Sequence, residues 1–240
     1  MAAHSGPNIV EEQLSLCLDA GNTKSYPSSS SDDWFDLSDN KLTFSSNGTK
    51  TPLEVKDGAL SFDLNGSGYW QSDSGHENVD MGGDCTLLMW VYCEDLTERD
   101  TIFEKVGTSY QSYQQEIAVT WETNESFSYY SRYSPTYDFG STSAMTANAW
   151  NFMGIKMSTG RTASARTGFY SKNGAAWTSN YTSRSDTALV SAGAIRVGTG
   201  YAGAVEQNAG NIAMVLCYNK MLSDAEVKQN FIATRGRFPI

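Results

Sequence analysis

Short segments in which apolar and polar residues alternate recur along the whole chain, each followed by turn-forming residues. In LSLCLDA, Leu14, Leu16 and Leu18 lie on one side of the alternation and Ser15, Cys17 and Asp19 on the other. Similar strand-like runs are ALSFDL, TLLMWVYC, DTIFEKV, EIAVTW, AWNFMGIKM, GAIRVG and NIAMVLCYN. A period of two is typical of strands that bury one face. The sequence therefore predicts an all-β chain, folded as an antiparallel sandwich.

Two local signals stand out from this pattern. The Asn173–Gly174 pair lies between strand-forming residues and predicts a tight hairpin. In LSDAEVKQNF, Ser223 and Glu226 have the spacing of a capping box, and Leu222 can pack on Val227. This segment predicts one short helix near the C-terminus, which we expect to cap an open end of the sandwich.

Length and charge narrow the classes of function. A chain of 240 residues is long enough for one sandwich domain, expected at residues 14–233 between an extended arm at 1–13 and a tail at 234–240. The net charge of −10 disfavours nucleic acid. No apolar run reaches the roughly 20 residues of a membrane helix, and the first residues lack a signal-peptide pattern, so we expect no membrane insertion and synthesis in a cytoplasm.

The four cysteines lie far apart in apolar, strand-like runs. They are Cys17, Cys85, Cys93 and Cys217, and none forms a C-x-x-C pair. We expect buried free thiols, although pairing of the terminal strands would bring Cys17 near Cys217.

The segment YYSRYSPTYDFG concentrates aromatic residues. Strand alternation places Phe127 and Tyr129 on one side, where they can fill the core, and Tyr130 with Arg132 on the other. Because Pro135 cannot donate to a sheet, the residues after it are expected on a loop or an edge. The candidate patch comprises Tyr130, Arg132, Tyr133, Tyr137 and Phe139. Such a patch can pack over the sandwich rim, join a protein interface, or stack on sugars.

Several stretches together resemble one family. They are GPNIVEEQLSLCLDAGNTKSYP, WFDLSDN, GALSFDLNGSGYW, CTLLMWVY, FYSKNG and NIAMVLCYNKMLSDAEVKQNFIATRGRF. The chain is similar to the concanavalin A-like lectin/glucanase superfamily, in particular to the laminin G-like domains of marine bacteriophage (cyanophage-like) virion structural proteins. The resemblance implies a two-sheet jelly roll in which the first and last long strands lie side by side.

The resemblance also implies a setting and partners. It suggests a virion protein on the exterior of the head or tail, a homo-oligomer in contact with other virion proteins. The first expectation is a head decoration protein that assembles through its rim and through the arm residues Pro7, Asn8, Ile9 and Val10. The alternative is a tail or fibre adhesin that binds host-surface polysaccharide.

We do not expect enzymatic activity. Glucanases of this superfamily carry paired carboxylates on one strand, and no E-x-D-x-x-E strand occurs here. The only histidines, His4 and His76, lie outside any nucleophile motif. No cofactor is expected, except that acidic loops at the rim can hold calcium in this fold family, with Asp19, Asp36 and Asp39 as candidate ligands.

Overall fold

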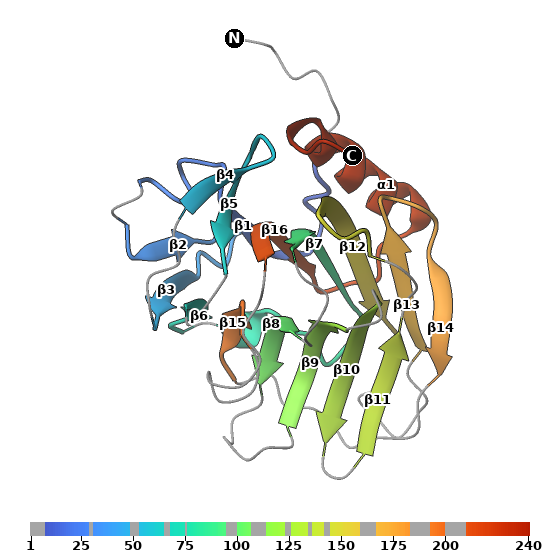
Figure 1. Cartoon of the computed structure of the whole chain (residues 1–240). Coiled ribbons are helices and arrows are strands. Elements are labelled where there is room, and N and C mark those ends of the chain that lie inside the picture. Colours follow the sequence, from blue (N-terminus) through green and yellow to red (C-terminus); the bar gives the residue numbers. More distant parts are fainter. Residues whose placement is uncertain are drawn as a thin grey trace.

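The computed structural model describes most of the chain (Figure 1). The described residues are 8–28, 31–48, 53–64, 68–74, 76–94, 100–106, 114–122, 126–133, 136–141, 145–158, 167–182, 193–199 and 210–240.

Two antiparallel sheets form the body of the molecule. Among the described residues each sheet has eight strands. The first sheet has the order β14-β13-β12-β7-β16-β5-β4, with β1 also paired to β16; its strands are β1 (Leu14–Asp19), β4 (Leu53–Lys56), β5 (Ala59–Asp63), β7 (Cys85–Cys93), β12 (Ala149–Met157), β13 (Thr167–Lys172), β14 (Thr178–Thr182) and β16 (Gly210–Tyr218). The second has the order β11-β10-β9-β8-β15-β6-β3-β2; its strands are β2 (Asp33–Phe35), β3 (Thr43–Asn47), β6 (Tyr69–Ser72), β8 (Asp100–Val106), β9 (Gln114–Trp121), β10 (Phe127–Tyr133), β11 (Thr136–Ser141) and β15 (Ile195–Val197). The predicted two-sheet sandwich is confirmed.

The first and last long strands lie side by side, as the resemblance implies. In the antiparallel pair of β1 and β16, Leu16 is opposite Cys217 and Cys17 is opposite Leu216. Since neighbouring positions of a strand point to opposite faces, this register separates the two thiols. Cys217 lies in the core between the sheets and Cys17 in a second cluster outside the first sheet. All four cysteines are buried, and none of them forms a disulfide.

Tight turns join several strands. Asn173 and Gly174 both have positive φ, +51° and +70°, and the Ala175 N–H donates to the Lys172 carbonyl at 3.1 Å. These values identify a type I′ turn and confirm the predicted hairpin. A second Asx-Gly turn of this kind joins β4 to β5, at residues 57–58, with φ of +46° and +83°.

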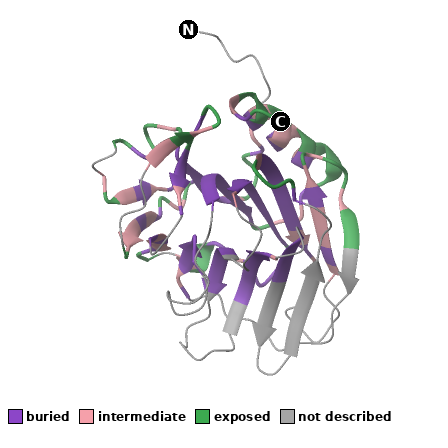
Figure 2. Ribbon diagram, viewed as in Figure 1, coloured by how far each residue is buried: buried purple, intermediate pink, exposed green. Residues whose placement is uncertain are grey.

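The main core fills the space between the sheets. Its largest contributions are aromatic: Trp34, Phe62 and Trp70 contact one another with ring centroids 4.7 to 5.8 Å apart. Phe127 and Tyr129 are buried in the same core, as the alternation of β10 predicts. Figure 2 shows the buried parts of both sheets facing each other.

The helix α1 (Asp224–Thr234) lies on the outer face of the first sheet, on the side away from the second sheet (Figure 1). Its predicted capping box is present, with Ser223 as N-cap and reciprocal bonds to Glu226. The prediction that it caps an open end is wrong. The outer side of the sheet offers Trp90 and Phe152, and α1 packs Phe231 against them with centroid distances of 5.9 and 5.6 Å.

The segments expected as arm and tail are held by the chain itself from Asn8 onward. The Val10 N–H donates to Asn230 Oδ1 at 2.8 Å, and Gln229 Nε2 donates to the Asn8 carbonyl at 2.8 Å. At the other terminus Phe238 stacks on Trp90 with a centroid distance of 4.0 Å. Pro7 lies outside the described residues. In the described part of the chain, no helix is long and apolar enough to cross a membrane.

Candidate functional site

The two outer faces of the sandwich differ in chemistry. On the first sheet the outward residues are largely apolar, and α1 and the arm cover them. On the second sheet the outward positions carry charged and hydroxyl side chains. We call this second surface the polar face, and it is the first candidate site.

One row of register partners crosses the polar face from strand to strand. The partners, in order across the sheet, are Asp33, Ser45, Gln71, Arg196, Glu104, Ala118, Tyr130 and Phe139. Partners directly opposite one another share a face. The neighbouring row on the inner side runs through Trp70, Val197, Phe103, Val119 and Tyr129, all of them in the core. The first row therefore faces outward.

A hydrogen-bonded chain of side chains forms the middle of this row. Arg196 Nε donates to Gln71 Oε1 at 2.9 Å, and Arg196 Nη1 donates to Glu104 Oε1 at 3.3 Å. Glu104 is fully buried and Arg196 is 4% exposed. Burial of these charges is tolerable because each is paired with the other. The arrangement holds a guanidinium, a carboxylate and an amide at fixed positions on an outward face.

The next row is made of hydroxyl residues. Thr101 lies opposite Thr120, and Thr120 lies opposite Ser128. All three are fully buried, and Thr120 Oγ1 donates to Glu122 Oε1 at 3.0 Å. Ser128 Oγ has no hydrogen-bond partner among the described residues, although most buried hydroxyl groups in proteins have one.

The predicted aromatic patch lies in the hairpin of β10 and β11, at the edge of this sheet. Tyr130 is opposite Phe139, and Arg132 is opposite Tyr137. These four positions belong by register to the polar face, whereas Tyr133 belongs to the other face. The edge position predicted for the residues after Pro135 is confirmed. The side chains of the five residues lie outside what the structure describes.

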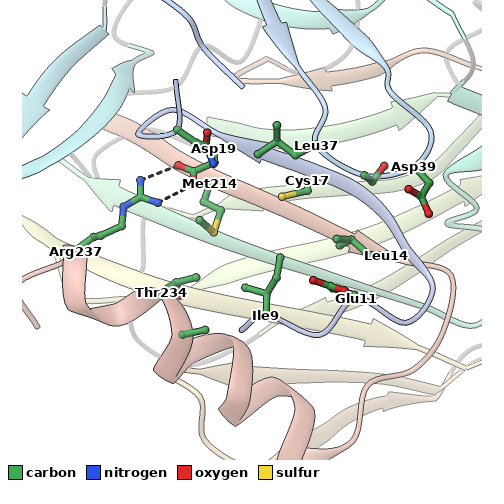
Figure 3. A pocket seen from close by; sticks show the side chains of 13 residues that line it. Ile9, Glu11, Leu14, Cys17, Asp19, Leu37, Asp39, Met214, Thr234 and Arg237 are labelled. Atoms are coloured by element: carbon green, nitrogen blue, oxygen red, sulfur yellow. Dashed lines mark hydrogen bonds and ion pairs between the residues drawn. The ribbon is translucent and has the colours of Figure 1, made fainter. Parts of the chain in front are cut away.

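A second candidate site is a pocket on the outer face of the first sheet, beside α1. It is a trough with a volume of about 540 Å³. Cys17 and Met214 lie in its floor, and Figure 3 shows the side chains that line it. Leu14 and Leu37 contribute apolar walls. Burial, followed by the nearby carboxylates of Asp19 and Asp36, raises the pKa of Cys17 to about 12, so its thiol stays protonated at neutral pH.

The three candidate calcium ligands lie near this trough but differ in their surroundings. Asp19 makes two bonds of 2.7 Å with the Arg237 guanidinium. Asp36 is buried and accepts from the Cys17 and Ser38 N–H groups, both at 2.8 Å. Asp39 is exposed and lines the trough. In the described part of the chain, no group of three or more His, Cys, Asp or Glu side chains is placed to hold a metal ion. Calcium binding stays a prediction.

One buried ion pair of the second sheet belongs to the interior instead. Lys105 lies 3.3 Å from Glu116, and its ammonium also donates to the Val79 carbonyl. Burial lowers the pKa of Lys105 and raises that of Glu116, while their mutual attraction opposes both changes. The Met81 N–H donates to Glu116 Oε2 at 3.3 Å, so the pair holds the adjoining loop against the sandwich.

Three residues of the polar face were not predicted from the sequence: Gln71, Glu104 and Arg196. A weak signal existed, because each charged residue interrupts an apolar run, in DTIFEKV and in GAIRVG. A charge on the outward side of a strand is ordinary, so that signal alone identifies no site.

Comparison with known proteins shows which solved structures share this fold. No protein-family model matches the chain, and no curated protein matches it at a significant level. Solved structures do match. Domain 4 of AbnA, a GH43 extracellular arabinanase from Geobacillus stearothermophilus in complex with arabinotriose, has a TM-score of 0.66 and 16% identity, over 93% of this chain and 100% of that chain.

Two larger proteins contain a similar domain. A mutant of Trypanosoma rangeli sialidase displaying trans-sialidase activity matches with a TM-score of 0.65 and 12% identity, over 95% of this chain and 34% of that one. Botulinum neurotoxin type C, whose cell entry depends on interaction with two ganglioside molecules, matches with a TM-score of 0.65 and 13% identity, over 91% and 50%. The chain thus spans about a third of the sialidase and half of the neurotoxin chain. At these identities the likeness shows the fold: a two-sheet sandwich of the jelly-roll kind.

Proposed function

We propose that the chain is a non-enzymatic glycan-binding domain whose binding surface is the polar face of the second sheet. The observation that carries the proposal is the register of that face. It places four patch positions, Tyr130, Arg132, Tyr137 and Phe139, on the same surface as the Arg196–Glu104 pair.

This combination of residue types suits a sugar. A pyranose or furanose ring has an apolar surface, on which an aromatic ring can stack, and a rim of hydroxyl groups. Fixed amide, carboxylate and guanidinium groups orient such hydroxyls, and the charged ones bond most strongly.

The comparisons support the proposal in kind. The arabinanase domain was solved with arabinotriose, and the neurotoxin interacts with gangliosides. They therefore agree with the adhesin expected as the alternative, and none of the structures named above points to decoration of a phage head. Since one fold serves many functions, the sugar must be identified from the site.

The chemistry of the polar face supports binding without hydrolysis. A glycosidase of the usual kind needs two carboxyl groups facing the cleft, one of them protonated. In the described part of the face, Glu104 is bound to Arg196, Glu122 accepts a bond from Thr120, and Asp33 accepts a bond from Ser45 at 3.1 Å.

A tail or fibre of a phage is the setting that we propose for this domain, on the basis of the sequence resemblance. Weak binding to single sugars would be strengthened there by many copies acting together. Immunogold labelling of purified virions tests the setting: label at the tail tip supports it, and label spread over the head contradicts it.

Glycan binding itself can be tested on the isolated chain. We would measure binding to a glycan array that includes arabinotriose and sialic acid-containing oligosaccharides. The double variant Tyr137→Ala/Phe139→Ala should weaken binding by about tenfold or more, the loss expected when aromatic anchors worth at least about 1.4 kcal/mol are removed.

The matched control is Tyr133→Ala, an aromatic truncation in the same hairpin at a position of the opposite face. It should leave binding unchanged. Equal loss of binding in the control and in the double variant would exclude the polar face as the binding surface, and absence of binding to every glycan would contradict the function.

A further inference from the structure

The trough beside α1 is a second place at which this domain can hold a ligand. It lies on the outer face of the first sheet, whereas the polar face belongs to the second sheet, so a test of one does not depend on the other. Its volume of about 540 Å³ falls in the range of small-molecule sites.

The two ends of the trough differ in charge. At one end, Asp19 and Arg237 neutralise each other through two bonds of 2.7 Å. At the opposite end lie the carboxylates of Glu11 and Asp39 (Figure 3). Both are exposed, and neither has a side-chain hydrogen bond or ion pair among the described residues. That end therefore carries two unpaired negative charges.

The floor between the ends is apolar, whereas the hydroxyls of Ser38 and Thr234 in the walls are hydrogen-bonded within the chain. Met214 is 5% exposed and Cys17 is 6% exposed, and both lie in the floor. The Cys17 thiol is protonated at neutral pH and makes no hydrogen bond among the described residues. A ligand body in this part must accordingly be apolar, because a polar one would lose its bonds to water without replacement.

The walls are fixed rather than loosely packed. Asp36 fixes the loop that carries Leu37 and Asp39, since it accepts bonds from the Cys17 and Ser38 N–H groups. The opposite wall is the last turn of α1, whose Thr234 receives a bond of 2.8 Å from Trp90 Nε1. A preformed site of this kind costs little ordering when a ligand binds.

We infer that the trough binds a ligand with an ammonium or guanidinium group on an apolar body, the cation beside Glu11 and Asp39 and the body over Met214. A free alkylamine and a lysine or arginine side chain of a partner share this chemistry. Lys41 lies on the same loop, but its ammonium donates to the Leu37 carbonyl at 3.1 Å and does not line the trough.

NMR of the chain labelled with methyl-¹³C methionine would test this. The Met214 methyl group reports from the floor, and Met153, buried in the core between the sheets, serves as the internal reference. Hexylamine should shift the Met214 resonance in a saturable way and leave Met153 unmoved. The neutral isostere 1-hexanol should bind at least several-fold more weakly.

Two variants separate the charge from the cavity. The double variant Glu11→Gln/Asp39→Asn should weaken the affinity for hexylamine about three- to tenfold, the combined effect expected when two partly exposed charge contacts are lost. Glu12→Gln, the same change at the neighbouring residue, should not, because Glu12 does not line the trough and pairs with Lys220 at 2.7 Å. Both sites are exposed, so the variants should fold, which circular dichroism would verify.

The dipeptide amide acetyl-Leu-Lys-NH₂ and its norleucine analogue identify the source of the cation. Binding of the lysine peptide, but not of the analogue, would support a partner side chain, and binding of hexylamine alone would support a free amine. A trough that takes hexanol as well as hexylamine, or a Met214 resonance that no probe shifts at tens of millimolar, would overturn the inference. So would equal affinities in the double variant and in Glu12→Gln.

Discussion

Asn230 joins the helix, the arm and the first sheet, and its removal gives the sharpest test of this arrangement. Its side chain is fully buried. Oδ1 accepts from the Val10 N–H at 2.8 Å and lies 3.2 Å from the Tyr218 hydroxyl. That hydroxyl is also 3.0 Å from the Val10 carbonyl. Burial raises the pKa of Tyr218, so it remains a donor throughout the neutral range.

The cost of Asn230→Ala follows from these contacts. The Val10 N–H loses its acceptor, and an unsatisfied buried donor costs about 1–3 kcal/mol. The Tyr218 hydroxyl keeps the Val10 carbonyl and loses little. The small cavity adds about 1 kcal/mol, but Asn230 Nδ2 has no partner among the described residues, so its removal offsets about the same amount. We expect a loss of about 1–3 kcal/mol.

Urea and thermal unfolding, followed by tryptophan fluorescence, would measure this loss. For a chain of this size the expected fall in Tm is about 2–12 °C. The control Gln229→Ala removes only an exposed bond to the Asn8 carbonyl and should cost about 0.5 kcal/mol or less. Limited proteolysis should also cut residues 8–13 faster in Asn230→Ala. A loss below 1 kcal/mol, or one no larger than that of the control, would refute the reasoning.

Three further predictions concern a turn, a cap and the thiols. Gly174→Ala should lower the free energy of unfolding in urea by about 1–3 kcal/mol, because φ is +70° and the new Cβ would lie 2.7 Å from Phe231. The control Gly58→Ala also has a positive φ, +83°, but its Cβ would meet open space, so it should cost less. Equal costs would contradict the role of Phe231. Burial acts to raise the pKa of Glu226, but hydrogen bonds from Lys220 and Ser223 outweigh it and hold the pKa below the ordinary 4.5. The ionised form therefore stabilises the fold above about pH 4.5, and this contribution is lost as pH falls through the folded-state pKa. Glu226→Gln should therefore lower Tm at pH 7 and have a smaller effect at pH 3. A constant difference would argue against a contribution of the ion pair between Lys220 and Glu226, in which Nζ lies 2.6 Å from Oε1. Iodoacetamide at pH 8 should leave the native thiols unlabelled and label four after denaturation, because burial keeps groups such as Cys17 protonated; rapid native labelling would contradict this.

The local signals in the sequence were reliable where one short stretch decides the structure. The capping box of Ser223 and Glu226 and the turn at Asn173 depend on residues within four positions, and both formed. The position of the helix was wrong because it depends on the far side of a sheet. Apart from Thr86, the run TLLMWVYC consists of aliphatic, aromatic and cysteine residues, which is typical of a strand covered on both faces. Accordingly, β7 is buried along its whole length.

The polar face shows why a site of this type escapes sequence reasoning. Glu104 and Arg196 are 92 residues apart in the chain, and they meet only because β15 lies between β6 and β8. Nothing local to either residue predicts that strand order. By contrast, simple alternation placed Tyr130 and Arg132 on one side, and the hairpin register of β11 then added Tyr137 and Phe139.

The opposite placement of the two candidate sites has a functional consequence. The outer face of the first sheet packs its apolar residues against α1 and contains the trough, which ends in the carboxylates of Glu11 and Asp39, unpaired among the described residues. The polar face lies on the other side of the core, behind the rigid layer that contains Trp70 and Phe103. A ligand on one face therefore cannot reach the other, and the domain can hold both at once. If a glycan occupies the polar face and a cationic group of a partner occupies the trough, the sandwich links two surfaces without moving, which is the mechanical task of an adhesin.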